Sequence, residues 1–467
     1  MQLNRSNNPV TAILWQSACF ALCFFSFMMT GSMINSRAGE LLGPGHVNTI
    51  YTIGLICTGA GFLSFSAARK LFANESLRKV IISAVGIVCV VSVCLFLITA
   101  DMTIFCISAF LALVTCGHIG GCVYYHHAMT FTNSRYMGRA TGIGMAVATM
   151  IQILIHRFAM QKAVLICGIA VSILLVLYII FRLPKDWMLD DPLPYSSENR
   201  TDIITAAILI AAVALMSLVS GTIDSVITFF DATGRINVYF GVRIFYAVGL
   251  LTAGFLSDML DKKYLSFATA CTILLSSAST ALLGSTAGAY VGTALMYLYS
   301  GFYIIFLTVM FCELAPKSRC PELWAGMGRV VRCLFVALMV TPTMRIYELA
   351  GTTALVVISC ALSILLLVVL IYYIVRFDRK EPEPQPEELS QEQLMQRFAE
   401  SFSLTPRETE VLERLLSTED GVQEIADSLF ISRRVLQRYI ASVYEKTGTK
   451  SRIGLFQIFT KYISEQK

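Results

Sequence analysis

The pentapeptide AGFLS occurs twice in this chain of 467 residues, at positions 60–64 and again at positions 253–257. The first copy ends the second long apolar stretch of the chain, and the other copy ends the eighth. Twelve such stretches precede residue 376, each long enough to cross a hydrocarbon core of about 30 Å. The longest polar interruption, residues 184–201, separates six of them from the other six. This pattern predicts a membrane domain made of two duplicated halves.

The overall composition also indicates a membrane protein. Hydrophobic residues make up 56% of the chain and charged residues only 14%, whereas soluble domains contain about 25% charged residues. The 14 cysteines are scattered through apolar runs without metal-ligand spacing, so we expect no disulfide framework, no metal site and no cofactor. No hydrolase elbow, phosphate-binding loop or zinc-hydrolase helix is visible, and we therefore expect no enzyme.

The distribution of Lys and Arg predicts the orientation of the membrane domain. If the N-terminus is cytoplasmic, 17 of these cations lie on the inner side and only 5 lie in outer loops. An excess of Lys and Arg marks cytoplasmic loops. We therefore expect a multi-pass protein of the inner (cytoplasmic) cell membrane, with both termini inside the cell.

The second AGFLS copy continues as GFLSDMLDKKY, at positions 254–264. This stretch resembles the signature loop of the major facilitator superfamily, in which Gly-x-Leu-x-Asp precedes two basic residues. The resemblance implies that Gly254 allows close helix approach and that Asp258 caps a neighbouring helix, expected by repeat analogy to be the one near Arg329. The first copy has Phe65 where the family has the acid, which argues against active transport.

Ionisable side chains inside the apolar stretches predict a ligand site, because charge is expensive to place in a bilayer. Four candidates are Asp224, Arg243, His118 and Arg332. Asp224 and Arg243 could pair across a short loop, and this pair could equally be structural. His118 could be a packed, hydrogen-bonded histidine, and Arg329 is expected to reach the lipid headgroups. The expected ligand is an uncharged, aromatic or weakly anionic small molecule in a central cavity.

The composition changes near residue 376. Residues 377–392 are acidic and Pro-rich, which predicts an extended linker. Residues 393–467 have the composition of a soluble domain. We therefore predict an all-α protein: a transmembrane, transporter-like domain over 1–376 with twelve helices, the linker, and a four-helix domain over 393–467.

The soluble region has the signals of a helix-turn-helix. Thr405 and Glu408 form a predicted capping box that begins a helix. A short second helix and a tight turn follow, and Ser432 then caps a long helix that ends at Gly448. A fourth helix completes the domain. From residue 431 onward there are eight Lys or Arg residues and two acids, a balance that suits phosphate binding.

Residues 404–452 resemble the LuxR/FixJ-type DNA-binding domain over its whole length. The opening LTPRETEVL, the EIA at 424–426, the IS at 431–432 and the later KTG and SR match the family pattern. The resemblance implies binding to double-stranded promoter DNA, as a homodimer on two half-sites. The residues that it places at DNA are Ser432, Arg433, Arg434, Val435, Gln437, Arg438, Lys446, Lys450 and Arg452.

One departure from the family affects the base preference. The usual Thr-Val-Lys of the recognition helix is replaced by Val435, Leu436 and Gln437, and the usual His is Tyr439. Gln437 can still hydrogen-bond a base edge, favouring adenine. The preferred DNA sequence therefore stays open.

Two functions follow from these observations. The first, which we favour, is a membrane-bound transcription regulator that senses a small molecule. The alternative is a small-molecule transporter of the major facilitator type with a regulatory helix-turn-helix tail. Phe65 and the lack of a row of membrane carboxylates favour the sensor. A third interpretation, a tail that binds another protein, explains fewer of the matched positions.

Overall fold

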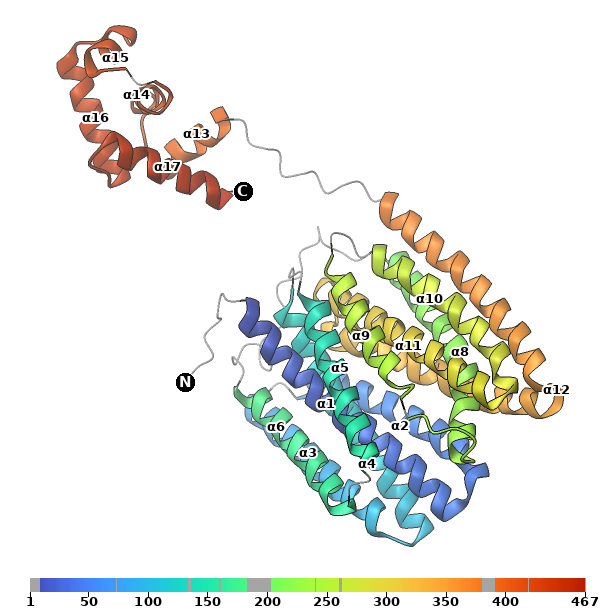
Figure 1. The fold of residues 1–467 in the computed structure, drawn as a ribbon. Helices are drawn as coiled ribbons and strands as arrows, with labels where there is room; N and C mark the ends of the chain where they lie inside the picture. Colours follow the sequence, from blue (N-terminus) through green and yellow to red (C-terminus); the bar gives the residue numbers. More distant parts are fainter. Residues whose placement is uncertain are drawn as a thin grey trace. The chain divides into compact units, whose positions relative to one another are not determined.

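The computed structural model describes the chain except residues 1–8, 73, 133–135, 159–160, 183–202, 240, 260–262, 380–390, 419 and 467. The described residues form helices and no strands, which confirms the all-α class. The chain divides into two compact units, Met1–Phe377 and Asp378–Lys467 (Figure 1). Outside the described residues lie the polar divider between the halves, most of the linker, and several of the cations used to predict orientation, namely Arg5, Arg135, Lys185, Arg200, Lys262 and Lys380.

The first unit is a bundle of long apolar helices. Its first half contains α1 (Pro9–Leu42), α2 (Pro44–Leu71), α3 (Glu75–Ile98), α4 (Met102–Thr130), α5 (Met137–Arg157) and α6 (Lys162–Arg182). Its second half contains α8 (Ile203–Ala232), α9 (Ile244–Ser257), α10 (Lys263–Ala281), α11 (Thr286–Leu314) and α12 (Pro321–Arg379). The last helix, α12, extends beyond the predicted domain end at residue 376 into the predicted linker.

The number of membrane spans is close to the predicted one. Among the described residues, 10 helices are long and apolar enough to cross a membrane. Helix α9 is apolar but has only 14 residues. Helix α12 has 59 residues and joins two helices across a kink at Gly351, where φ is 68°. Twelve spans require that α9 and both parts of α12 are counted, so the figure of twelve stays a prediction.

Glycines bring the helices of the bundle into close contact. A Cβ atom on Gly61 in α2 would lie 2.2 Å from the carbonyl oxygen of Val114 in α4. A Cβ atom on Gly254 in α9 would lie 2.6 Å from the carbonyl oxygen of Gly138 in α5. No side chain fits at either position without moving a backbone. The expected role of Gly254 is thus confirmed, and its close neighbour is α5.

The second unit has five helices in the part that is described, so the predicted number of four is wrong. They are α13 (Gln391–Ser401), α14 (Pro406–Ser417), α15 (Val422–Ser428), α16 (Arg433–Thr447) and α17 (Arg452–Gln466). The additional helix is α13, whose Phe398 is fully buried against Phe402, Phe459 and Tyr462. The unit therefore has a hydrophobic core of its own.

The predicted helix ends of this unit are confirmed. The Thr405 side chain accepts a hydrogen bond from the backbone N–H of Glu408, and the Glu408 carboxylate accepts one from the backbone N–H of Thr405. The Ser432 side chain accepts from the N–H of Val435 at the start of α16. Gly448 ends α16 in the left-handed conformation, with φ 68°.

Candidate functional sites

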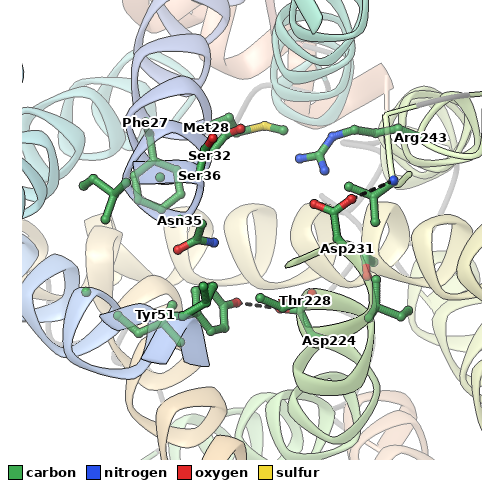
Figure 2. A pocket seen from close by; sticks show the side chains of 18 of the residues that line it. Phe27, Met28, Ser32, Asn35, Ser36, Tyr51, Asp224, Thr228, Asp231 and Arg243 are labelled. Carbon is green, nitrogen blue, oxygen red and sulfur yellow. Dashed lines mark hydrogen bonds between the residues drawn. The ribbon is translucent and has the colours of Figure 1, made fainter. Parts of the chain in front are cut away.

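The membrane unit contains a cavity of about 600 Å³, which is lined by residues of α1, α2, α8, α9, α11 and α12, together with Leu113 of α4 and His156 of α5. This volume suits a small molecule. Three of the four predicted ligand residues, Asp224, Arg243 and Arg332, line the cavity. Its lining extends to Gly39 and Glu40 at the C-terminal end of α1. Figure 2 shows Asn35 of α1 opposite Asp231 and Arg243 across the cavity.

Asp224 and Arg243 have separate partners within the cavity. The Tyr51 hydroxyl donates a hydrogen bond to the Asp224 carboxylate at 2.5 Å (Figure 2). Arg243 donates to the Tyr297 hydroxyl at 3.1 Å, and its guanidinium lies 5.0 Å from the centre of the Tyr239 ring. No ion pair joins Asp224 and Arg243 in the structure as described, so their predicted pairing is wrong. Aromatic hydroxyl groups on neighbouring helices take the place of the opposite charge.

Arg329 is buried in the bundle, with 6% of its surface exposed. Its Nε donates a hydrogen bond to the Tyr124 hydroxyl at 2.5 Å, and its guanidinium lies 5.4 Å from the centre of the Phe24 ring. The expectation that Arg329 reaches the headgroups is therefore wrong. Arg329 also lines the cavity. Its spacing of three residues from Arg332 on one helix could have revealed this, because such residues share a face.

His118 does not line this cavity. Its Nδ1 lies 2.8 Å from the Ser64 hydroxyl, and its ring makes an edge contact with Phe65 at 5.7 Å between centroids. His118 is 7% exposed. The structure therefore separates His118 from the other three candidates and favours the alternative of a packed, hydrogen-bonded histidine.

Asp258 connects the two halves of the bundle. Its carboxylate oxygens accept hydrogen bonds from the backbone N–H groups of Gly138 and Arg139, both at 2.8 Å. The Arg139 Nε lies 3.4 Å from the same carboxylate. Asp258 thus caps the start of α5, where the helix dipole favours a negative charge. The expectation that it caps the helix near Arg329 is wrong.

The first AGFLS copy makes a different contact. Phe65 is 8% exposed and packs against the rings of His118 and Tyr125. Lys70, later in the same helix, lies 3.8 Å from Glu322 in the first turn of α12. At this copy the acid therefore comes from the opposite half. Lys70 is 54% exposed, so the pair contributes little to stability.

One face of α16 carries unpaired cations. Arg433, Arg434, Gln437 and Arg438 are all exposed, while Leu436 on the opposite side is fully buried in the core of the unit. In the described part of the unit no carboxylate pairs with any of these arginines. Of the other predicted DNA contacts, Ser432 and Lys450 are exposed and Val435 is half-buried. The face offers positive charge and one amide to an outside partner.

Lys446 and Arg452, two further predicted DNA contacts, make bonds inside the domain. The Lys446 ammonium lies 2.6 Å from the Glu408 carboxylate and donates to the Ser403 carbonyl at 3.1 Å. Arg452 donates to three backbone carbonyl oxygens at the end of α14 and in the connection to α15, those of Leu415, Thr418 and Asp420. Both cations stabilise the domain, and the structure therefore favours a structural role for them.

Glu408 is a buried acid of this unit, with 5% of its surface exposed. Burial alone would raise the pKa of its carboxyl group. Hydrogen bonds from Lys446, Ser442 and Thr405 outweigh burial and lower the pKa from 4.5 to about 2. Glu408 is therefore ionised at neutral pH and joins α14 to α16.

The C-terminal unit contains a known family of domain. The model described as bacterial regulatory proteins, luxR family, matches residues 402–459. The unit is therefore a LuxR-family helix-turn-helix domain, as its motifs predicted, and such domains bind DNA. No curated protein sequence matches the chain.

Most of the chain is similar in fold to solved transporters. The crystal structure of the human organic anion transporter MFSD10 (TETRAN) matches with a TM-score of 0.54 and 12% identity, covering 78% of this chain and 100% of that one. The structure of an E. coli fucose:proton symporter, FucP, matches with a TM-score of 0.49 and 13% identity, covering 79% and 98%. At these identities the similarity concerns the fold alone. The similarity to the MFSD10 fold agrees with the major facilitator resemblance of the sequence and with a multi-pass membrane protein.

Proposed function

We propose that this protein is a membrane-bound transcription regulator, in which the membrane domain binds a small molecule and the C-terminal domain binds double-stranded promoter DNA. The observation that carries the proposal is the exposed cationic face of α16 in a LuxR-family domain. The same chain holds a transporter-like bundle with a cavity of small-molecule size. A ligand that binds the bundle could change how often two tails meet on DNA, and a coupling of about 1–3 kcal/mol would change binding about 5- to 150-fold.

On this proposal Arg433, Arg434 and Arg438 contact phosphates, and Gln437 contacts a base edge. Ser432, Val435 and Lys450 lie beside them at the DNA surface. Lys446 and Arg452 act by holding the domain together. Recognition helices of this plan lie in the major groove, where an amide pairs with adenine.

We further propose that two C-terminal domains pair on two half-sites through α17. Ile453 and Phe456 of α17 are 73% and 55% exposed, and their spacing of three residues places them on one face of the helix. Phe459, three residues after Phe456, contacts the buried Phe398 ring, with 5.1 Å between the ring centroids. Because Phe459 packs in the core, the pairing surface that we propose consists of Ile453 and Phe456.

The proposed orientation places twelve spans in the inner membrane with both termini in the cytoplasm. The support is the excess of Lys and Arg in the predicted inner loops. A reporter that is active only in the cytoplasm should work after Lys467 and fail when it is inserted at Gly43. Activity at Gly43 would mean that the orientation is inverted.

The experiment for DNA binding uses a fragment of residues 391–467, which includes the core of the second unit. The fragment should retard promoter DNA, with affinity falling steeply as salt rises, because binding releases counterions from phosphates. Arg433→Ala/Arg434→Ala should bind weakly. A folded fragment that retards no promoter fragment at low salt would refute DNA binding.

A second candidate function is a small-molecule transporter of the major facilitator type with a regulatory helix-turn-helix tail. The transporter-like fold and the cavity favour it. Phe65 in place of the family acid disfavours it, because the first copy has lost the group that caps the facing helix. Uptake of a bound compound into proteoliposomes would support transport, whereas binding without uptake would support the sensor.

A further inference from the structure

Three arginines line the membrane cavity without a carboxylate partner. They are Arg243 of the α8–α9 connection, and Arg329 and Arg332 of α12. Throughout the described ranges, no carboxylate oxygen lies within 4.0 Å of any of the three guanidiniums. Arg243 Nε, Arg329 Nη2 and Arg332 Nε are buried and have no hydrogen-bond partner there. Each of these cations is therefore incompletely satisfied by the protein.

The acids of the cavity are already engaged elsewhere. Asp224 accepts a hydrogen bond from Tyr51. Asp231 accepts one from the backbone N–H of Val238 at 3.1 Å, as Figure 2 shows. Glu40 pairs with Arg37 at 2.6 Å. With that last pair cancelled, three arginines face two aspartates, and the cavity carries a net charge of about +1 at neutral pH.

Arginines that form no ion pair are costly to place in a bilayer. Asp224 attracts Arg243 and Arg332 only from beyond ion-pair distance, so the hydration that these cations lose is only partly offset. Arg332 differs from the other two in its hydrogen bonding, because Arg329 donates to Tyr124 and Arg243 donates to Tyr297. No hydrogen bond or ion pair of Arg332 is found among the residues that the structure describes. An anion in the cavity would supply the missing partner.

Aromatic rings connect the two ends of this cationic lining. The Arg329 guanidinium lies 5.4 Å from the centre of the Phe24 ring, and the centre of this ring lies 6.4 Å from that of Tyr246. Tyr246 in turn lies 6.1 Å from Tyr297, whose hydroxyl accepts from Arg243. These rings offer flat apolar contact between the guanidiniums. A ligand with an apolar ring and one negative group would use both features.

We propose that the ligand of the membrane domain is a small organic anion with an aromatic body, and that Arg332 is the first contact of its negative group. This inference rests on the proposed function, because it specifies the ligand of the proposed sensor. Arg329, three residues away on α12, lies on the same face and adds a second positive charge near the ligand. A planar guanidinium binds a carboxylate through two parallel hydrogen bonds.

The test uses full-length protein in lipid nanodiscs, with benzoate as the anion and benzamide as its neutral counterpart of similar shape. Benzoate at about 10 mM should raise the melting temperature of the membrane domain, and benzamide should bind about tenfold more weakly. This comparison requires no variant. Equal stabilisation by the two compounds, or no stabilisation by benzoate, would overturn the inference.

Variants locate the contact. Arg332→Gln should weaken benzoate binding about tenfold and leave benzamide binding unchanged. The matched control is Arg345→Gln, which removes the same charge from an exposed position of α12 outside the cavity, and it should have no effect. Unchanged benzoate affinity in a folded Arg332→Gln protein would contradict the assignment.

The outcome is separable from the proposed function. DNA retardation by the fragment 391–467 does not involve the cavity and is measured independently. If the fragment binds DNA but a neutral compound occupies the cavity, the regulator stands and the anionic ligand is refuted. If benzoate binds as expected but the fragment binds no DNA, the cavity assignment stands and the regulator is refuted.

Discussion

The arginines of the two units share one feature and differ in another. Arg243, Arg329 and Arg332 of the membrane unit lie around a cavity without carboxylate partners. Arg433 and Arg434 of the C-terminal unit also have no carboxylate partner in the described residues, but their side chains are exposed on one face of α16. The cavity around the buried arginines has room only for a small anion, whereas an exposed row of cations can contact the phosphates of a DNA duplex.

Other cations of the same units show what a structural role looks like. Lys446 is held by Glu408, and Arg139 lies beside Asp258 at the start of α5. Arg452 donates to the carbonyl oxygens of Leu415, in the last turn of α14, and of Asp420, just before α15. The contrast indicates that the unpartnered cations are the ones to test for function. Substitutions in the two groups should therefore differ in their effects on stability and on ligand or DNA affinity.

The first prediction concerns stability. Glu408→Ala in the fragment 391–467 should lower the free energy of unfolding by about 3 kcal/mol, because it leaves Lys446 unpaired and removes the capping box. Arg433→Ala, on the exposed face, should change it by less than about 0.5 kcal/mol. Urea unfolding measures both. Equal effects of the two substitutions would remove the distinction between Lys446, which Glu408 holds in place, and the exposed Arg433.

The second prediction concerns DNA affinity, on which the exposed residues of α16 should have the larger effect. Arg434→Ala or Arg438→Ala should weaken binding to all sequences and lower the salt dependence by about one unit. Gln437→Ala should relax preference at one base pair, by roughly 1–3 kcal/mol. Titrations of one promoter fragment and a scrambled fragment at two salt concentrations measure these effects. A Gln437→Ala protein with unchanged base preference would exclude this side chain from base reading.

The third prediction concerns pH. The folded pKa of Glu408 is about 2, below its ordinary value of 4.5. Its contribution is therefore fully present above pH 4.5 and is lost as the pH falls toward 2. The urea midpoint of the fragment should drop across this range, and Glu408→Gln should make the drop shallower. Identical pH profiles of the two proteins would show that another acid controls the transition.

Local signals in the sequence were sufficient for part of this structure. Capping residues act on backbone groups a few positions away, so Thr405, Ser432 and Gly448 could be identified without tertiary information. Helix α13 was missed although Leu394, Met395, Phe398 and Ala399 follow a helical pattern, since its neighbouring acidic linker dominated the composition. The luxR family match of the C-terminal domain required only the order of its residues.

Contacts between distant helices could not be predicted in the same way. The repeat analogy identified Asp258 as a cap but could not tell which of two equivalent helix starts it meets. The burial of Arg329 depends on the Tyr124 hydroxyl, which comes from another helix. The sequence suggested Asp224, Arg243 and Arg332 because charge is costly in a membrane, yet hydroxyl groups of tyrosines replaced the expected ion pair.

The most direct test of a membrane regulator is to map the genomic DNA bound by the full-length protein in growing cells. Wild type should occupy discrete promoters, and Arg434→Ala/Arg438→Ala should lose them. Arg332→Gln, which leaves the DNA-binding domain intact, should change occupancy only under the conditions that alter wild-type occupancy. Absence of enriched promoters in wild type, or the same promoters in the Arg434→Ala/Arg438→Ala variant, would contradict the account.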